Sequence, residues 1–307
     1  MAAQESATAA SAGPVIRTEL LERRYGARLA LHGLSLTVPA GSVFGFLGPN
    51  GAGKTTAVKL LLGLVRPTAG EAMVLGRPVG DPAARRRIGY LPELFRYQDW
   101  LSGREVLCSH AALAGIGRAM RAEAVDRALE TVGLAADGLR RVGTFSKGMQ
   151  QRLGLAVALL GTPDLVVLDE PTSALDPVGR HEVRQIIQGL KASGVTVFLN
   201  SHLLTEIEAV CDEVAVLDRG RVIAQGRLEE LLQAKGVEVE MEGMTADEIA
   251  LLGGSPAEGR TVRFRDMAEG DVPELVAAIV RGGGRIHAVR ALRTSLEQRF
   301  LDWLEVR

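Results

Sequence analysis

The sequence predicts an α/β fold in which helices cover a parallel sheet. Three apolar runs have the length of a buried strand, and the stretches between them have helical periodicity, an alternation typical of parallel sheets. These runs are "LVVLDE" at 165–170, "VTVFLN" at 195–200 and "EVAVLD" at 213–218. Nearer the N-terminus, a glycine-rich turn at 48–53 joins a strand-like run to a helix-like one. The chain therefore contains a further strand, loop and helix of the same kind.

The other predicted elements follow in order along the chain. Residues 1–14 are small and polar, and we expect them to form a disordered tail. Between about 93 and 160 we expect a helical subdomain, because the periodicity is helical from about 103 onward without a strand-like run. The predicted sheet and the helical subdomain belong to one domain, 15–226. Within it, strands are predicted at 15–20, 33–39 and 43–47, and helices around Val58, Leu61, Leu62 and Val65, at 178–191 and at 203–210.

The character of the sequence changes after Gly226, where strand-like and helix-like runs alternate on a smaller scale. A second, α+β domain at 227–307 is predicted, of marginal size for folding alone. Its strands are expected at 237–241, 261–265 and 285–290, and its helices at 273–281 and 295–304.

Composition excludes several classes of function. The chain has 307 residues and a formal net charge of −1, so no basic field for nucleic acid is present. Cys108 and Cys211 lie far apart among apolar neighbours, which indicates neither a disulfide framework nor a zinc site. No apolar run reaches the roughly 18 residues of a membrane span, so we expect that the chain does not cross a membrane by itself.

A phosphate-binding loop is the most specific motif. The segment "GPNGAGKTT" at 48–56 fits G-x-x-x-x-G-K-[ST] between a predicted strand and a predicted helix. Backbone N–H groups at the start of the helix favour phosphate, Lys54 adds a cation for the β- and γ-phosphates, and the Thr55 hydroxyl can bind Mg²⁺. The candidate nucleotide-binding residues are Gly48, Pro49, Asn50, Gly51, Ala52, Gly53, Lys54, Thr55 and Thr56.

Two carboxylates and a histidine close later strands. Asp169 comes at the end of "LVVLD", where open α/β sheets bind ligands, and we expect it to hold Mg²⁺ through water. Glu170 follows, and a carboxylate beside the metal can deprotonate an attacking water, which indicates hydrolysis. His202 comes after "VTVFLN" at the same edge, so we expect it to contact the γ-phosphate.

The order of "GPNGAGKTT", "FSKGMQQR", "LVVLDEP", "SALD" and "SH" resembles the ATP-binding subunits of ABC transporters over about residues 15–226. The resemblance implies a P-loop NTPase sheet core with an antiparallel β part and an inserted helical subdomain, and ATP and Mg²⁺ as cofactors. It also implies that Tyr25 stacks on adenine and that Asp176 communicates between the two sites of a dimer. An ordinary strand aromatic is the alternative reading of Tyr25.

In two places the chain departs from the family pattern. The signature reads "FSKGM" and keeps Ser146 and Gly148, the residues that the resemblance places on the ATP of a partner cassette. Ser146 also fits a helix N-cap, and both roles are compatible. Where the family commonly has Gln, this chain has Glu93, and a carboxylate can also bind Mg²⁺.

The resemblance also implies partners. Together with the C-terminal domain, "GYLPE" and "FSKGM" are similar to cassettes of multidrug, antibiotic-resistance or polysaccharide exporters. We therefore expect separate transmembrane permease subunits and a homodimer of cassettes. We also expect a peripheral place at the cytoplasmic face of the cell membrane, and no nucleic-acid partner. Phe95, Tyr97 and Trp100 either receive a helix of the membrane subunit or pack in the core.

The alternative functions are a soluble ABC-type ATPase and a P-loop kinase of another family. A soluble ABC-type ATPase acting in translation would resemble two fused cassettes, and one acting in DNA repair would carry a long coiled coil before the signature. The chain has neither pattern. A P-loop kinase of another family would leave Glu170 and the signature unexplained.

Overall fold

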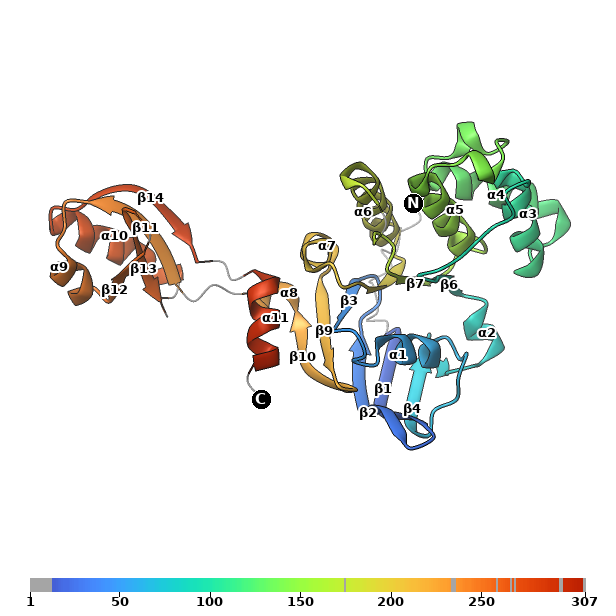
Figure 1. The fold of residues 1–307 in the computed structure, drawn as a ribbon, viewed down its shortest axis with the longest axis horizontal. Coiled ribbons are helices and arrows are strands. Elements are labelled where there is room, and N and C mark those ends of the chain that lie inside the picture. The colour runs from blue at the N-terminus through green and yellow to red at the C-terminus, as the bar shows by residue number, and fades with distance from the viewer. Residues whose placement is uncertain are drawn as a thin grey trace, which may run out of the picture. The chain divides into compact units, whose positions relative to one another are not determined.

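A computed structural model of the chain divides into two compact units, one ending at Leu228 and the other beginning at Glu229 (Figure 1). The tail expected at 1–14 lies outside the described residues up to position 12. The structure describes residues 13–173, 175–232, 236–257, 259–265, 267, 269–292 and 295–305.

A six-stranded sheet with the order β10-β9-β3-β8-β7-β6 forms the centre of the first unit. All neighbouring strands are parallel except β10, which pairs antiparallel with β9. Every residue of β3, β7 and β8 is buried, which explains their continuous apolar sequences. The strands are β3 (Val43–Leu47), β6 (Ile88–Leu91), β7 (Leu165–Asp169), β8 (Thr196–Asn200), β9 (Glu213–Asp218) and β10 (Arg221–Arg227).

Aromatic packing joins the middle strands of this sheet. The Phe198 ring lies 5.8 Å from that of Phe44 and 5.3 Å from that of Phe46, between ring centroids. Three helices begin beyond the carboxyl ends of β3, β7 and β8, namely α1 (Lys54–Leu61), α6 (Pro177–Ala192) and α7 (Leu204–Val210). The parallel sheet with helical connections predicted from the sequence is therefore confirmed.

An antiparallel sheet with the order β2-β1-β4-β5 completes the β part of this unit. Its first two strands extend beyond the predicted ranges and are joined by a hairpin at Gly26 and Ala27. The sheet consists of β1 (Ile16–Tyr25), β2 (Arg28–Val38), β4 (Ala69–Val74) and β5 (Arg77–Pro78), and a short helix, α2 (Pro82–Arg85), follows it.

A helical lobe is inserted between β6 and β7 (Figure 1). Its helices span 103–159, and residues 93–102 precede them without helix. Ser102 and Glu105 form a capping box at the start of α3, and Ser146 caps α5. The lobe contains α3 (Gly103–Leu113), α4 (Arg121–Thr131) and α5 (Lys147–Leu159), with short 3₁₀ helices at Arg118–Met120, Ala135–Asp137 and Val142–Thr144.

The second unit is an antiparallel sheet with the order β12-β13-β11-β14, connected as a split βαβ unit. Val239, Phe264 and Ile279 belong to its core, and Glu238 pairs with Arg263 on the polar side of β11. This alternation explains why its strands were predictable. Its elements are β11 (Gly236–Glu242), α9 (Ala246–Leu251), β12 (Gly254–Pro256), β13 (Thr261–Arg265), a 3₁₀ helix (Glu269–Asp271), α10 (Val272–Arg281), β14 (Arg285–Ala291) and α11 (Leu296–Glu305). A short helix, α8 (Leu228–Leu231), spans the division between the units.

Candidate functional site

The candidate site lies at the carboxyl edge of the central sheet. β3, β8, β7 and β6 are parallel neighbours in that order, so the segments that follow them meet at one edge. The phosphate-binding loop follows β3, His202 follows β8, Glu170 follows β7 and Glu93 follows β6. The fold thus brings four separately predicted groups to the same place.

Two positions of the phosphate-binding loop require glycine, because a Cβ there would lie too close to a backbone carbonyl oxygen of another segment. Gly48 has φ 154°, and a Cβ there would lie 2.2 Å from the Leu217 carbonyl oxygen. Gly53 has φ 110°, and its Cβ would lie 2.7 Å from the Ala30 carbonyl oxygen. α1 begins directly after Gly53, without a side-chain cap and without an acidic residue in its first turn. Its first-turn N–H groups are thus oriented toward an acceptor outside the helix, which fits phosphate.

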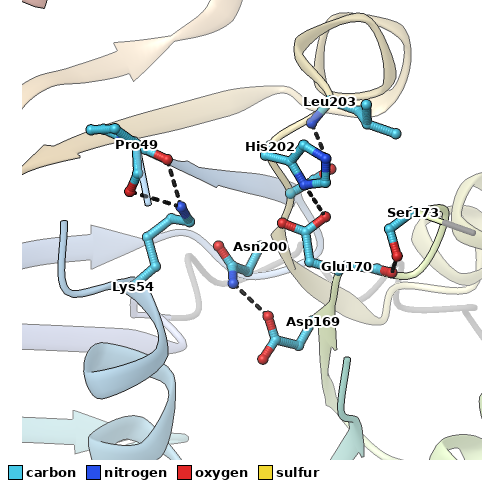
Figure 2. Close-up of polar contacts among 10 residues, drawn as sticks. Pro49, Lys54, Asp169, Glu170, Ser173, Asn200, His202 and Leu203 are labelled. Carbon is cyan, nitrogen blue, oxygen red and sulfur yellow. Dashed lines mark hydrogen bonds and ion pairs between the residues drawn. The ribbon is translucent and has the colours of Figure 1, made fainter. Parts of the chain in front are cut away.

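Lys54 is buried at the start of α1. Its ammonium donates hydrogen bonds to the carbonyl oxygens of Gly48, at 2.5 Å, and Pro49, at 3.2 Å (Figure 2). Burial lowers the pKa of Lys54, while the negative charges of Glu170, Asp169 and Glu93 act in the opposite direction. All three carboxylates therefore favour the charged form of the Lys54 ammonium.

Asp169 is buried at the end of β7 and faces Asn200 at the end of β8. The two residues are register partners, and the Asn200 Nδ2 donates to Asp169 Oδ1 (Figure 2). Burial raises the pKa of Asp169, the hydrogen bond from Asn200 lowers it, and the charge of Glu93 raises it. Asn200 was not among the predicted site residues. The signal that could have found it is a polar residue ending the buried run "VTVFLN".

Glu170 and His202 form a direct pair. His202 Nδ1 lies 2.7 Å from Glu170 Oε2, and the histidine side chain is 54% exposed while that of the glutamate is 10% exposed. Glu170 has φ 53°, a left-handed conformation that costs a non-glycine residue about 1–2 kcal/mol. Its N–H donates to the Asn200 carbonyl oxygen at 2.8 Å, and its carbonyl oxygen accepts from Ser173 Oγ. Backbone and side-chain contacts thus fix the direction of this carboxylate.

The donor set fits a magnesium ion bound together with phosphate. Within the described residues, no group of three or more His, Cys, Asp or Glu is arranged to hold a metal ion by itself. Mg²⁺ instead takes one or two carboxylates with phosphate oxygens and water. The residues that could serve such an ion are Asp169 and Glu93, through their carboxylates, and Thr55, through the hydroxyl that is exposed in the first turn of α1.

Four predicted residues make no hydrogen bond or ion pair with 48–56 among the described residues. Tyr25 ends β1, and the Arg23 guanidinium lies 4.6 Å from its ring centroid. Ser146 accepts from the Met149 N–H as N-cap of α5, and Gly148 lies in the first turn of that helix. Asp176 caps α6 through the Gly179 N–H at 2.8 Å. The N-cap predicted for Ser146 is therefore confirmed, and Asp176 caps its helix in the same way.

Three aromatic residues follow Glu93 and have different surroundings. Tyr97 packs against Phe95 and, edge to face, against His110, and burial raises its pKa. Trp100 is 69% exposed. Tyr97 therefore belongs to the packing of the helical lobe, and Trp100 presents its ring to the surface.

Comparison with known proteins gives a consistent result. The family described as "ABC transporter" matches residues 31–173. An uncharacterized ABC transporter ATP-binding protein of Nostoc sp. is 40% identical over 285 residues, covering 90% of this chain and 84% of the relative. The bacitracin transport ATP-binding protein of Bacillus licheniformis is 41% identical, with 69% of each chain covered. The Nod factor export ATP-binding protein I of Burkholderia lata is 38% identical, with coverage of 77% and 76%.

A solved structure agrees with the fold. The structure of the ATP-binding subunit of an ABC transporter superposes with a TM-score of 0.64 at 30% identity, over 71% of this chain and 91% of that chain. The part of this chain that it covers is comparable in size to the first unit.

Proposed function

The chain belongs to the ATP-binding proteins of ABC transporters, and on that premise we propose that it hydrolyses ATP through Glu170 in a dimer of cassettes that drives export. That it is the ATP-binding subunit of an ABC transporter, and an ATPase, follows from the family itself. The residues that act, the metal, the dimer and the direction of transport are the parts that we propose.

The observation that carries the proposal is the Glu170–His202 pair beside Asp169 and Lys54. The loop 48–53 and the N-terminus of α1 hold the phosphates, with Lys54 as their cation. Thr55, Asp169 and Glu93 hold Mg²⁺, which when bound supplies polarisation of the γ-phosphate. Glu170 accepts the proton of the attacking water, and His202 holds that carboxylate and reaches the γ-phosphate.

A dimer explains the predicted residues that have no hydrogen bond or ion pair with the phosphate-binding loop among the described residues. Ser146 and Gly148 are in the helical lobe, with Ser146 exposed. In our proposal they contact the ATP held by Lys54 of a second copy. One chain carries both halves of the site, which supports a homodimer related by two-fold symmetry. Tyr25 keeps one ring face for adenine beside Arg23, and Asp176 lies at the start of α6 to couple the two sites.

Export is supported by the names of relatives that transport bacitracin and export Nod factor. Among the described residues, no helix is long and apolar enough to span a bilayer. We therefore assign translocation to separate membrane-spanning subunits, to which the protein binds at the cytoplasmic face. The exposed Trp100 ring is part of the surface offered to them.

The test compares two Glu→Gln variants of the purified protein. Glu170→Gln should keep ATP affinity and accumulate an ATP-bound dimer, while turnover falls by roughly 10²-fold or more. Glu274→Gln, an exposed change on α10 in the second unit, is the matched control and should behave as wild type. Turnover in Glu170→Gln near the wild-type rate would contradict the assignment.

A further inference from the structure

Asn200 contacts two consecutive residues of the candidate site, the side chain of Asp169 and the backbone of Glu170. Its Nδ2 donates to Asp169 Oδ1, and its backbone carbonyl oxygen accepts the Glu170 N–H at 2.8 Å. Asn200 is 2% exposed and ends the buried strand β8. One residue of β8 thus fixes the positions of two consecutive residues at the end of β7.

The orientation of the amide follows from its partner. A carboxylate only accepts hydrogen bonds, so the amide nitrogen must face Asp169 and the amide oxygen must point away from it. Figure 2 shows this arrangement, with the oxygen on the side away from Asp169. The Asn200 Oδ1 is buried and has no hydrogen-bond partner among the described residues.

The Asn200 amide is destabilising at the end of a buried strand, because its oxygen has no hydrogen-bond partner among the described residues. A buried acceptor without a hydrogen-bond partner lowers the stability of the folded protein, and an apolar residue of similar volume avoids that cost. The neighbouring positions Val197, Phe198 and Leu199 are apolar and buried. The cost at Asn200 is therefore explained by what its donor atom does for Asp169.

We propose that Asn200 is a positioning residue of the magnesium site, which holds Asp169 by Oδ1 so that Oδ2 is directed to the metal and its waters. The same residue sets the backbone of Glu170 one position later, so metal site and general base are aligned together. This inference rests on the proposed function of Asp169. Groups that orient a metal ligand typically change metal affinity or activity by roughly 10–100-fold when removed.

The experiment measures the Mg²⁺ response of the full-length protein in two ways. One is the Mg²⁺ concentration that gives half of the Mg²⁺-dependent rise in melting temperature with ATP present, and the other is the concentration that half-saturates hydrolysis. The variants are Asn200→Leu, similar in volume and without polar atoms, and Asn200→Ala. Thr196→Val is the control, because Thr196 lies at the other end of β8 and accepts from the Gly41 N–H.

Both Asn200 variants should raise both Mg²⁺ concentrations by roughly 10-fold, while the stabilisation by ATP in EDTA keeps its wild-type value. Thr196→Val should lower the melting temperature without changing the Mg²⁺ response. Mg²⁺ concentrations within twofold of wild type in a folded Asn200 variant would overturn the proposal, as would an equal loss of ATP binding with and without Mg²⁺. Loss of folding in both variants would make Asn200 structural and also overturn it. A wild-type protein without any Mg²⁺ response would instead contradict the proposed function.

Discussion

His202 Nδ1 lies 2.7 Å from Glu170 Oε2, which joins the ends of β8 and β7 at the candidate site. The carboxylate is nearly buried and the imidazole half exposed, so the histidine is the partner that a ligand can reach first. Because Glu170 is also fixed by its backbone contact with Asn200, its direction does not depend on His202 alone.

We expect that His202→Ala slows hydrolysis by roughly 10²-fold and changes ATP affinity by less than about threefold. The phosphate-binding loop is intact in this variant, while Glu170 loses its side-chain partner. Steady-state kinetics and ATP titration measure the two quantities. His287→Ala, in the second unit, is the control, since His287 contacts Glu242 there. A wild-type turnover number in His202→Ala would exclude His202 from the reaction.

We expect two Gly→Ala changes in the phosphate-binding loop to lower the free energy of unfolding by different amounts. A Cβ at Gly48 would overlap the Leu217 carbonyl oxygen, and the backbone there cannot move without shifting β9. A Cβ at Gly51 meets no atom within 4 Å and adds only the strain of φ 82°. Gly48→Ala should lower the free energy of unfolding by about 3 kcal/mol or more, and Gly51→Ala by about 1–2 kcal/mol. Denaturant unfolding that gave equal losses would contradict this account of the loop.

Substitutions at Tyr97 and Trp100 distinguish packing within the helical lobe from contact with the membrane subunits. Tyr97→Ala should lower the free energy of unfolding by about 2 kcal/mol or more, because Tyr97 packs against Phe95 and His110. Trp100→Ala should keep the melting temperature and the ATPase activity of the isolated protein, and weaken its co-purification with the membrane subunits. The docking assignment fails if Trp100→Ala destabilises the protein as much as Tyr97→Ala does.

The two units have separate cores, and we expect them to unfold in separate transitions. Phe198→Ala should lower the free energy of unfolding of the first unit by about 3–5 kcal/mol, and Phe264→Ala should lower that of the second unit by a similar amount. ATP should raise the transition temperature of the first unit alone, which is the transition that Phe198→Ala lowers, because the candidate nucleotide site lies in that unit. Calorimetry with both variants tests this. A single transition lowered by either change would mean that the units unfold together.

Much of the fold was predictable because burial leaves a simple pattern in the sequence. β7 and β8 are buried on both faces and read as continuous apolar runs, and β11 and β13 alternate because one face is covered. β6 was missed, since its four residues include Gly89 and are too few to show a period. β4 was missed because half of its six residues are exposed in a row at its start.

The site was predictable as a set of residues and not as a set of contacts. Lys54, Asp169, Glu170 and His202 follow from a motif and from strand ends, which need no knowledge of distant register. The contact of Asn200 with Asp169 joins residues 31 positions apart and depends on the register of β7 with β8. No local pattern encodes that register. The same reason applies to the backbone of Glu170, whose N–H donates to the Asn200 carbonyl oxygen on β8.

In the proposed dimer each ATP site is built from two chains, with Lys54 of one and Ser146 of the other. Lys54→Ala removes the phosphate cation, and Ser146→Arg blocks the signature, so each homodimer should be inactive. In a mixed dimer both lesions fall in one site if the signature acts across the interface, and the other site is then intact. If Ser146 acts only within its own chain, each site of the mixed dimer contains one lesion.

The ATPase activity of equal amounts of the two variants, mixed and allowed to exchange subunits, distinguishes these two arrangements. Random pairing makes about half of the dimers mixed, each with one intact site, so about a quarter of wild-type activity should return if the sites act independently. ATP-dependent dimerisation measured on the same mixture shows that exchange has occurred. Activity that stays at the level of the separate variants, in a mixture shown to contain mixed dimers, would contradict the account.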